Sequence, residues 1–402
     1  MRTIFKIIFF FLKALGLLIL ILVLVFVIKY ISCPVFSFQP GKPFEGELIY
    51  NPYQDLNPNH WHKGNFQVQS RAWGGITSGS GNSNEDIYKV YKNLGYEIIA
   101  TSDYQRINRF QEDEPGYIPV YEHGYSIPKT HQVLIGANRV LWKDYPFFQT
   151  IHNKQNIINK LRPDNQLIFL AHPKLRDGYT IHDMRLLANY DGIEVLNNYR
   201  TSNEHWDAAL SAGNYVTLIG NDDAHDISNP DEIGHHCTLI NSPGLSQQNI
   251  IKELKSGRSI GVKIWRPIGE TMEAKIKRTS TLPVLKKAQL EDHDFLIETD
   301  SVIREVRFIG QNGELLKTSV LPFSAVYTFT DKDSYVRAEI EFENQITFYL
   351  NPVCRYDGNS PAKMKAPEID LYRTWLLRVI GFATLGFLLV NYLKLRKRRK
   401  MA

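Results

Sequence analysis

The hydrophobic pattern places a long apolar run near each end of the chain. Ala14 to Ile28 is unbroken apolar sequence, and Ile7 to Leu12 extends it upstream with one lysine between the two runs. Trp375 to Leu393 is apolar at all but three positions. A helix needs about 20 apolar residues to cross a bilayer. The pattern therefore predicts transmembrane helices over residues 5–30 and 373–393.

Between these helices the pattern divides the chain into two regions. Residues 44–264 alternate short apolar, β-branched runs with amphipathic segments, which predicts an α/β fold with parallel strands and crossover helices. The expected strands are Phe66–Val68, Ile98–Thr101, Val133–Ile135, Leu167–Ala171, Ile193–Leu196 and Val216–Ile219. The expected helices are Ser83–Gly95, Thr180–Tyr190, Asn203–Ala212 and Leu245–Ser256.

The second region, residues 270–356, contains short β-rich runs with little helical periodicity. Asn312-Gly313 lies between two of these runs, and this pair of residues suits the turn of a β-hairpin. We therefore predict a small antiparallel β domain here. Residues 357–372 are rich in Gly, Asn, Ser and Pro, which indicates a linker to the second transmembrane helix.

The lysines and arginines that flank the two helices predict their orientation. Three basic residues precede or open the first helix, and six follow the second in a basic tail over residues 394–402. Cytoplasmic flanks of membrane helices carry an excess of Lys and Arg. We therefore expect both termini in the cytoplasm and the main domain on the other side of an inner or plasma membrane.

Charge and cysteine content change this picture little. The net charge is +5, but the membrane flanks hold twelve basic residues, which leaves −7 for residues 30–372. The basicity therefore reflects topology, and we expect no nucleic-acid partner. A lipid anchor at Cys33 or a cleaved signal peptide is a weaker alternative, because Tyr30-Ile31-Ser32 does not suit either cleavage. The sequence leaves open whether Cys237 and Cys354 pair.

Ionisable residues follow several apolar runs of the first region at their carboxyl ends. His172 follows one run, Asp103 follows another, and the cluster Asn221–Asp226, with Asp223 and His225, follows a third. In a β/α barrel the carboxyl ends of different strands converge on one site. Carboxylates and imidazoles together are typical of metal-dependent hydrolysis. For the cluster alone, an Asp-rich turn that caps the next helix is the alternative.

Taken in order, several segments resemble the motifs of the PHP superfamily, the polymerase and histidinol phosphatase domain. These segments are TSDY at Thr101–Tyr104, PVYEHG around Glu122, THQVLIG at His131, AHP at Ala171–Pro173 and DAH at Asp223–His225. The resemblance covers about residues 60–264. It implies a distorted (β/α)7 TIM-like barrel that holds up to three divalent metals and hydrolyses phosphate esters.

The chain departs from the family pattern at three places. Gln67 and Gln69 stand where the first motif has two histidines, and Tyr104 stands where the third histidine of the motifs belongs. The segment RAWGGITSGSGN also lacks a histidine that members of the family usually have. An amide oxygen is a weak ligand for zinc. Gln67 and Gln69 are therefore expected to be weak or lost ligands.

The resemblance thus implies a reduced metal site. Its expected ligands are Glu122, His131, His172, Asp223 and His225. The metal would be Mn, Zn or Fe, as a single ion, with catalytic roles for Asp223, His225 and Asp103. The expected protein is a membrane-anchored phosphoesterase acting on a small-molecule or envelope phosphate ester. The alternative is a catalytically inactive PHP-like barrel, without a metal, that binds a ligand or partner in the envelope.

Overall fold

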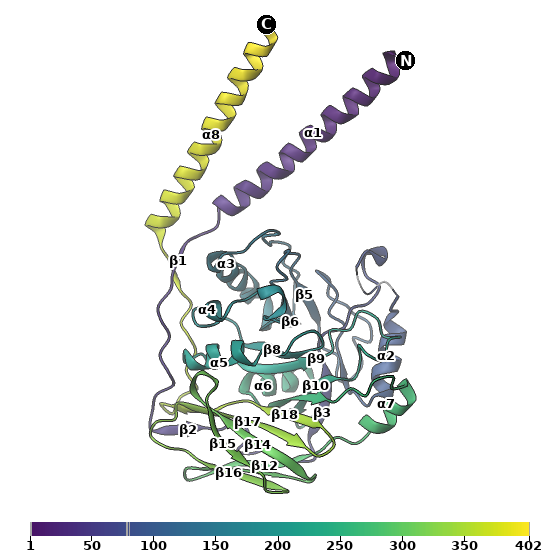
Figure 1. The fold of residues 1–402 in the computed structure, drawn as a ribbon, viewed down its shortest axis with the longest axis vertical. Coiled ribbons are helices and arrows are strands. Elements are labelled where there is room, and N and C mark those ends of the chain that lie inside the picture. Colours follow the sequence, from purple (N-terminus) through teal and green to yellow (C-terminus); the bar gives the residue numbers. More distant parts are fainter. Residues whose placement is uncertain (1, 78, 80, 402) are drawn as a thin grey trace.

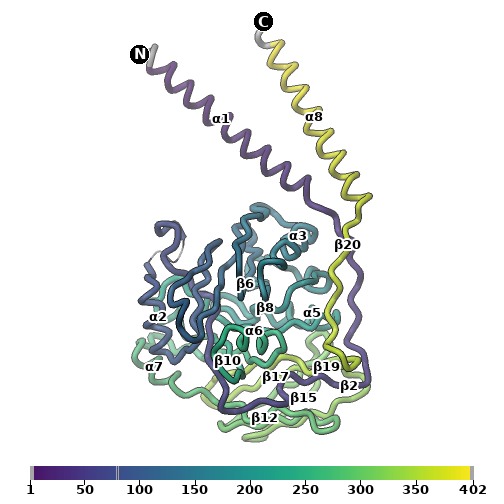
Figure 2. The backbone as a smooth tube through the Cα atoms, turned by 180° about the vertical axis from the view of Figure 1, so that it is seen from behind, coloured from purple at the N-terminus to yellow at the C-terminus, as the bar shows by residue number. Residues whose placement is uncertain are grey.

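Two long helices leave the same end of a globular body in the computed structural model, which describes residues 2–77, 79 and 81–401 (Figures 1 and 2). They are α1 (Arg2–Ile31) and α8 (Leu371–Met401). The segments Ile4–Ile31 and Leu371–Arg398 have mean hydropathies of 3.1 and 1.8, and none of their most apolar windows is buried against protein. Both helices are long and apolar enough to span a membrane.

A two-stranded clasp joins the bases of the two helices. Strands β1 (Phe36–Ser37) and β20 (Glu368–Ile369) pair antiparallel. The buried hydroxyl of Thr374 in α8 accepts a hydrogen bond from the Val35 N–H at 2.9 Å. The clasp therefore holds the start and the end of the globular body together at one point.

The largest sheet has ten strands and runs through both sequence regions. Its main path is β15-β14-β17-β18-β11-β10-β3-β4, with β19 and β2 attached beside β17. The strands are β2 (Leu48–Tyr50), β3 (Trp61–Asn65), β4 (Ile98–Ile99), β10 (His236–Asn241), β11 (Ser259–Ile264), β14 (Ile303–Ile309), β15 (Leu315–Ser319), β17 (Tyr335–Phe342), β18 (Ile346–Leu350) and β19 (Val353–Tyr356). Every pairing is antiparallel except β3 with β4. Because β11 pairs with β18, the C-terminal β region shares one sheet with the first region.

A three-stranded sheet packs on the C-terminal part of this large sheet. It contains β12 (Leu285–Glu291), β13 (Asp294–Thr299) and β16 (Ser324–Thr328), all antiparallel. Phe295 of β13, Phe308 of β14 and Tyr327 of β16 pack against one another in the core between the two sheets. This part of the molecule lies at the end opposite to α1 and α8 (Figure 1).

The third sheet has the order β5-β6-β7-β8-β9, and the predicted metal ligands lie in its strands or just beside them. Its strands are β5 (Val120–His123), β6 (Gln132–Ala137), β7 (Asn165–Leu170), β8 (Gly192–Asn197) and β9 (Thr217–Asn221). The last three are parallel, as predicted, but β6 is antiparallel to both neighbours. The connection from β5 to β6 is too short for a crossover helix, so the chain reverses as a hairpin.

The expectation of a closed (β/α)7 barrel is therefore wrong: the described residues form a mixed α/β structure in which no sheet closes. Only isolated bridges join the edges of the two larger sheets. Val68, just after β3, bridges Ala224, just after β9, and Tyr104 bridges Glu122 of β5. The polar ends of β3, β5 and β9 are nevertheless brought to one place by these bridges.

The helices cover the third sheet and the edge of the largest one. They are α2 (Asn84–Asn93), α3 (Ile151–Leu161), α4 (Ile181–Met184), α5 (Asn203–Ser211), α6 (Gln247–Ser256) and α7 (Met272–Thr279), with short 3-10 turns at Trp73–Gly75, Arg162–Asp164, Leu175–Asp177 and Gln311–Gly313. The predicted start of α2 is confirmed, since the Ser83 hydroxyl accepts from the Asp86 N–H. Helix α4 ends six residues earlier than expected, and α3 and α7 were not expected.

Candidate active site

Three predicted ligands lie together in a buried cluster. Glu122 lies in β5, His131 immediately precedes β6, and His172 follows β7. The Glu122 Oε1 atom is 2.5 Å from His131 Nδ1 and 3.5 Å from His172 Nε2. One ligand atom from each residue lies within 4.8 Å of the others, and all three side chains are buried. The hairpin and the neighbouring strand thus assemble a group that can hold a metal ion.

The electrostatics of the cluster favour an ionised glutamate. Burial alone would raise the pKa of Glu122, but the two imidazoles hold it well below its usual range. Burial lowers the pKa of His131, against the opposing effect of Glu122. For His172 burial acts in the same direction, but the nearby carboxylates of Glu122, Asp223 and Glu194 together outweigh it and raise the pKa to about 9. A carboxylate and two imidazoles form a common ligand set for Zn and related metals.

Several buried polar atoms beside the cluster have no hydrogen-bond partner among the described residues. They are Gln67 Oε1 and Nε2, Gln69 Oε1, His172 Nδ1 and Asp223 Oδ1. Buried polar atoms are rarely left in this state, because each one costs about 1–3 kcal/mol. So many in one place fit a site that binds a polar ligand or a cation.

The two glutamines differ in their contacts. Gln69 Nε2 donates to Glu122 Oε2 at 2.7 Å and to the Ser102 carbonyl at 2.9 Å. Its amide therefore orients the glutamate. The main-chain carbonyl oxygen of Gln67 accepts from the Asp223 N–H at 3.0 Å, which ties the segment of the glutamines, just after β3, to the segment just after β9. Tyr104, which stands where the family pattern has a histidine, lies with its ring against that of His131, 5.5 Å between centroids.

Asp223 and His225 lie next to each other beyond β9. Asp223 Oδ1 is 3.7 Å from His225 Nε2, and its other oxygen accepts from the Asn197 amide at 3.1 Å. Burial and the nearby Glu122 raise the pKa of Asp223 above its usual range. The His225 side chain is partly exposed, whereas Asp223 is buried. The pair therefore links the interior of the site to solvent.

Two site residues have left-handed backbone conformations. The φ angle is +31° at His172 and +50° at Asp223. Such conformations are uncommon for residues with a side chain and cluster at functional sites, where neighbouring structure holds them. Each lies two residues after the last residue of its strand, β7 or β9, where the chain turns away from the sheet.

Two further acids, Asp103 and Asp222, have their hydrogen-bond partners outside the Glu122–His131–His172 cluster. Asp103 accepts from the Ser70 hydroxyl and N–H and from the Asn108 amide. Its catalytic role stays a prediction. Asp222 accepts from three consecutive backbone N–H groups, of residues 234–236, and from the Tyr91 hydroxyl. These contacts give Asp222 a role in the fold.

The sequence prediction missed Glu194. This buried residue of β8 accepts from the His172 N–H at 3.0 Å and from the Asn197 and Asn221 amides. Burial, followed by the charge of Asp223, raises its pKa above the usual range. An acid in the middle of the apolar run IEVLN is the signal that could have identified it.

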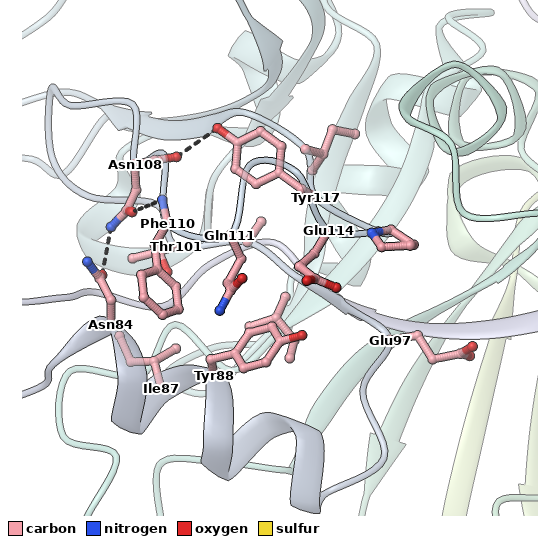
Figure 3. Close-up of a pocket in the computed structure, with 15 residues that line it drawn as sticks. Asn84, Ile87, Tyr88, Glu97, Thr101, Asn108, Phe110, Gln111, Glu114 and Tyr117 are labelled. Atoms are coloured by element: carbon pink, nitrogen blue, oxygen red, sulfur yellow. Dashed lines mark hydrogen bonds between the residues drawn. The ribbon is translucent and has the colours of Figure 1, made fainter.

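A separate pocket lies between α2 and the segment of residues 108–118 (Figure 3). It is lined by residues such as Tyr88, Phe110 and Tyr117, and it does not include the Glu122–His131–His172 cluster. Asn108 connects the two places, because its amide donates to both Asn84 in the pocket and Asp103. The pocket is therefore a neighbour of the candidate site and not its entrance.

No protein-family model matches the sequence, and no curated protein matches it. Among solved structures the chain is similar to a two-domain protein from Bacteroides vulgatus that contains a predicted PHP-like metal-dependent phosphoesterase. The identity is 13%, the match covers 83% of this chain and 100% of the other, and the TM-score is 0.36. A likeness at this level does not decide the function of this chain.

Proposed function

We propose that this chain is a membrane-anchored, metal-dependent phosphoesterase that acts on a phosphate ester outside the cytoplasm. Glu122, His131 and His172 would hold one divalent ion, of Mn, Zn or Fe. The observation that carries the proposal is the convergence of these three buried side chains from separate parts of the sequence. Their spacing alone, at positions 122, 131 and 172, gives no such grouping.

The residues around the cluster have roles that suit hydrolysis. A bound divalent ion would polarise the phosphoryl oxygens and lower the pKa of a bound water. Gln69 fixes the orientation of the glutamate, and Glu194 fixes the backbone of His172. Asp223 and His225 provide a path on which a proton is held inside the site and passed to solvent.

A second candidate function is metal or ligand binding without hydrolysis. The observation that favours it is the presence of two buried neutral amides, Gln67 and Gln69, where the family pattern has imidazoles. A centre with one ion lacks the clamp that a pair of metals places on the attacking and leaving oxygens. Activity measurements on the metal-loaded chain separate the two functions.

The test is the metal content of the full chain purified in detergent, measured by elemental analysis. We expect about one ion per chain, and its loss in His131→Asn and His172→Asn. His205→Asn is the matched control, because His205 is also buried but bonds to the Tyr179 carbonyl outside the cluster. A wild-type chain purified without any bound metal would overturn the proposed metal site. Bound metal without hydrolysis of simple phosphate mono- and diesters would favour the second candidate.

A further inference from the structure

The loops next to the cluster present exposed apolar side chains, which we call the apolar rim. Its residues are Trp73, Ile76, Tyr125, Ile127, Trp142 and Phe148. They come from three segments that surround the site: the turn after the two glutamines, the β5–β6 hairpin loop and the segment after β6. Exposed fractions reach 89% at Ile76 and 83% at Phe148. Large exposed apolar side chains gathered in this way mark a contact surface.

The rim is continuous with the membrane end of α1. The Phe26 ring packs edge-on against Phe147 at 5.5 Å, and the Phe147 N–H donates to the Tyr30 hydroxyl at 2.9 Å. Lys29 Nζ donates to the Tyr125 hydroxyl at 3.3 Å. The last turns of the apolar helix therefore touch the hairpin loop and the segment after β6.

The same contacts continue to the metal cluster. The Tyr125 hydroxyl donates to the Trp142 carbonyl, and the Trp142 and Trp73 rings lie 5.6 Å apart. The Trp73 indole N–H donates to the carbonyl of Tyr104, which bridges Glu122. The hairpin loop itself joins Glu122 to His131. The rim is thus the edge of the site on the side of α1.

This side faces the helices in both views of the fold: β5 and β6 lie in the half of the body nearer α1 and α8, and β12 lies in the far half (Figures 1 and 2). Tryptophan and tyrosine prefer the interface between lipid and water. One positive side chain accompanies them: Lys129 Nζ lies 5.7 Å from the centroid of the Tyr104 ring, which contacts His131. An ammonium at this place attracts a phosphate at the membrane surface.

We propose that the apolar rim lies in the outer interface of the bilayer and that the phosphate ester reaching the site is carried by a membrane lipid. The second half rests on the proposed function. The acyl chains stay in the bilayer beside the rim, and the headgroup phosphate enters past Lys129. Hydrolysis forms a bond from a water oxygen to phosphorus and breaks the ester P–O bond. The lipid alcohol leaves with a proton and free phosphate is released.

The position of the rim is tested by fluorescence quenching, which needs no activity. The full chain with Trp375→Phe, which removes the indole of the second span, is placed in phosphatidylcholine vesicles brominated near the headgroup end of the acyl chains. We expect strong quenching, most of which is lost when Trp73→Phe and Trp142→Phe are added. Trp61→Phe is the control, because its indole N–H donates to Leu285 O near the far sheet. Quenching that survives the Trp73 and Trp142 changes would overturn the proposal. The absence of quenching in the chain that keeps Trp73 and Trp142 would also overturn the proposal.

The substrate class is tested with two esters that share a headgroup: phosphatidic acid in vesicles and water-soluble glycerol phosphate. We expect wild type to prefer the vesicle substrate. Ile127→Asp with Phe148→Asp should lower that rate several-fold and leave the soluble rate unchanged, while Phe323→Asp, exposed on the far β part, changes neither. Equal rates, or equal losses on both esters, would overturn the lipid assignment. No hydrolysis of either ester by metal-loaded wild type would refute the proposed function, and quenching would still decide the position of the rim.

Discussion

The buried guanidinium of Arg337 connects the two sequence regions. It donates to both oxygens of Asp207 in α5, at 2.7 and 2.8 Å, and to Glu339 at 2.6 Å. Its plane also lies over the Trp206 ring, 5.1 Å from the centroid. The mutual charges raise the pKa of Arg337, although burial acts in the opposite direction. The guanidinium is therefore a fixed cation of the interior.

Arg337→Met leaves the buried Asp207 carboxylate without its cationic partner, whereas Glu339 keeps its ion pair with Arg307. Breaking such a group costs about 3–5 kcal/mol, so we expect a loss of this size in the free energy of unfolding. Arg304→Met is the control, because the Arg304–Glu341 pair is largely exposed and contributes at most about 1 kcal/mol. Denaturant unfolding of the detergent-solubilised chain measures both. Similar losses in the two variants would contradict the interpretation.

A second prediction at the residue scale concerns pH. Burial lowers the pKa of the His236 imidazole to about 3, so the residue is neutral in the folded chain. In the unfolded chain this histidine has a pKa of about 6.5, so between about pH 3 and pH 6.5 the unfolded chain binds more protons than the folded chain. The contribution of His236 is complete above about pH 6.5 and falls by about 1.4 kcal/mol per unit down to about pH 3. His236→Gln should flatten the profile of unfolding free energy against pH in that window; an unchanged slope would contradict it.

The candidate metal-binding residues show what one sequence reveals at this scale. Glu122, His131 and His172 were recognised through the family motifs, because motif order and residue type survive in a single chain. Glu194 was not recognised. Its importance lies in contacts to the His172 backbone and two asparagines, which are set by strand pairing and leave no spacing signal in the sequence.

Among the elements, the β5–β6 hairpin leaves no room for a side chain at Gly124. Gly124, with φ of +127°, begins the hairpin loop, and a Cβ there would lie 2.6 Å from His131 Cδ2. Gly124→Ala should therefore displace the His131 ring and weaken metal binding by about 10–100-fold, as changes that disturb the orientation of a ligand do. Competition with a chelator measures the affinity.

The matched control is Gly95→Ala. Gly95 also has a positive φ, of +78°, but no atom lies within 4 Å of an added Cβ. We expect a backbone cost of roughly 1–2 kcal/mol with unchanged metal affinity. An equal loss of metal in both variants would mean that general destabilisation, and not the His131 ring, is responsible.

The elements also show where pattern reasoning ends. Helix α2 was predictable because Ser83 and the acids after it form a local start signal. Helix α3 was missed, since IHNKQNIINKL is polar at positions that tertiary packing buries, among them Asn153 and Gln155. The hairpin reversal at β5–β6 was missed for a similar reason, because alternation of strands and helices does not specify the direction of pairing. The barrel expected from the resemblance is wrong because the chain reverses at β5–β6 and the sheet does not close.

At the scale of the whole molecule, the prediction of topology is open to a direct test. The basic residues that flank the two helices predict that both termini lie in the cytoplasm and that the globular body lies outside. A membrane-impermeant thiol reagent should label Asn359→Cys in intact spheroplasts and Lys397→Cys only after permeabilisation. Both positions are exposed, and two native cysteines, Cys237 and Cys354, are buried. The third, Cys33, is partly exposed, so both variants also carry Cys33→Ser. Labelling of Lys397→Cys in intact spheroplasts would contradict the orientation.

The clasp has a consequence for biosynthesis. Val35 and Thr374 are 339 positions apart, so the hydrogen bond between them, and the pairing of β1 with β20, forms only after nearly the whole chain has left the ribosome. Until then β1 has no partner strand, and the base of α8 is not bound to the base of α1. Closing so long a loop comes late in folding. A chain that ends before α8 therefore has only α1 as a candidate membrane helix beside the apolar rim and the Glu122–His131–His172 cluster. The completed chain has both helices.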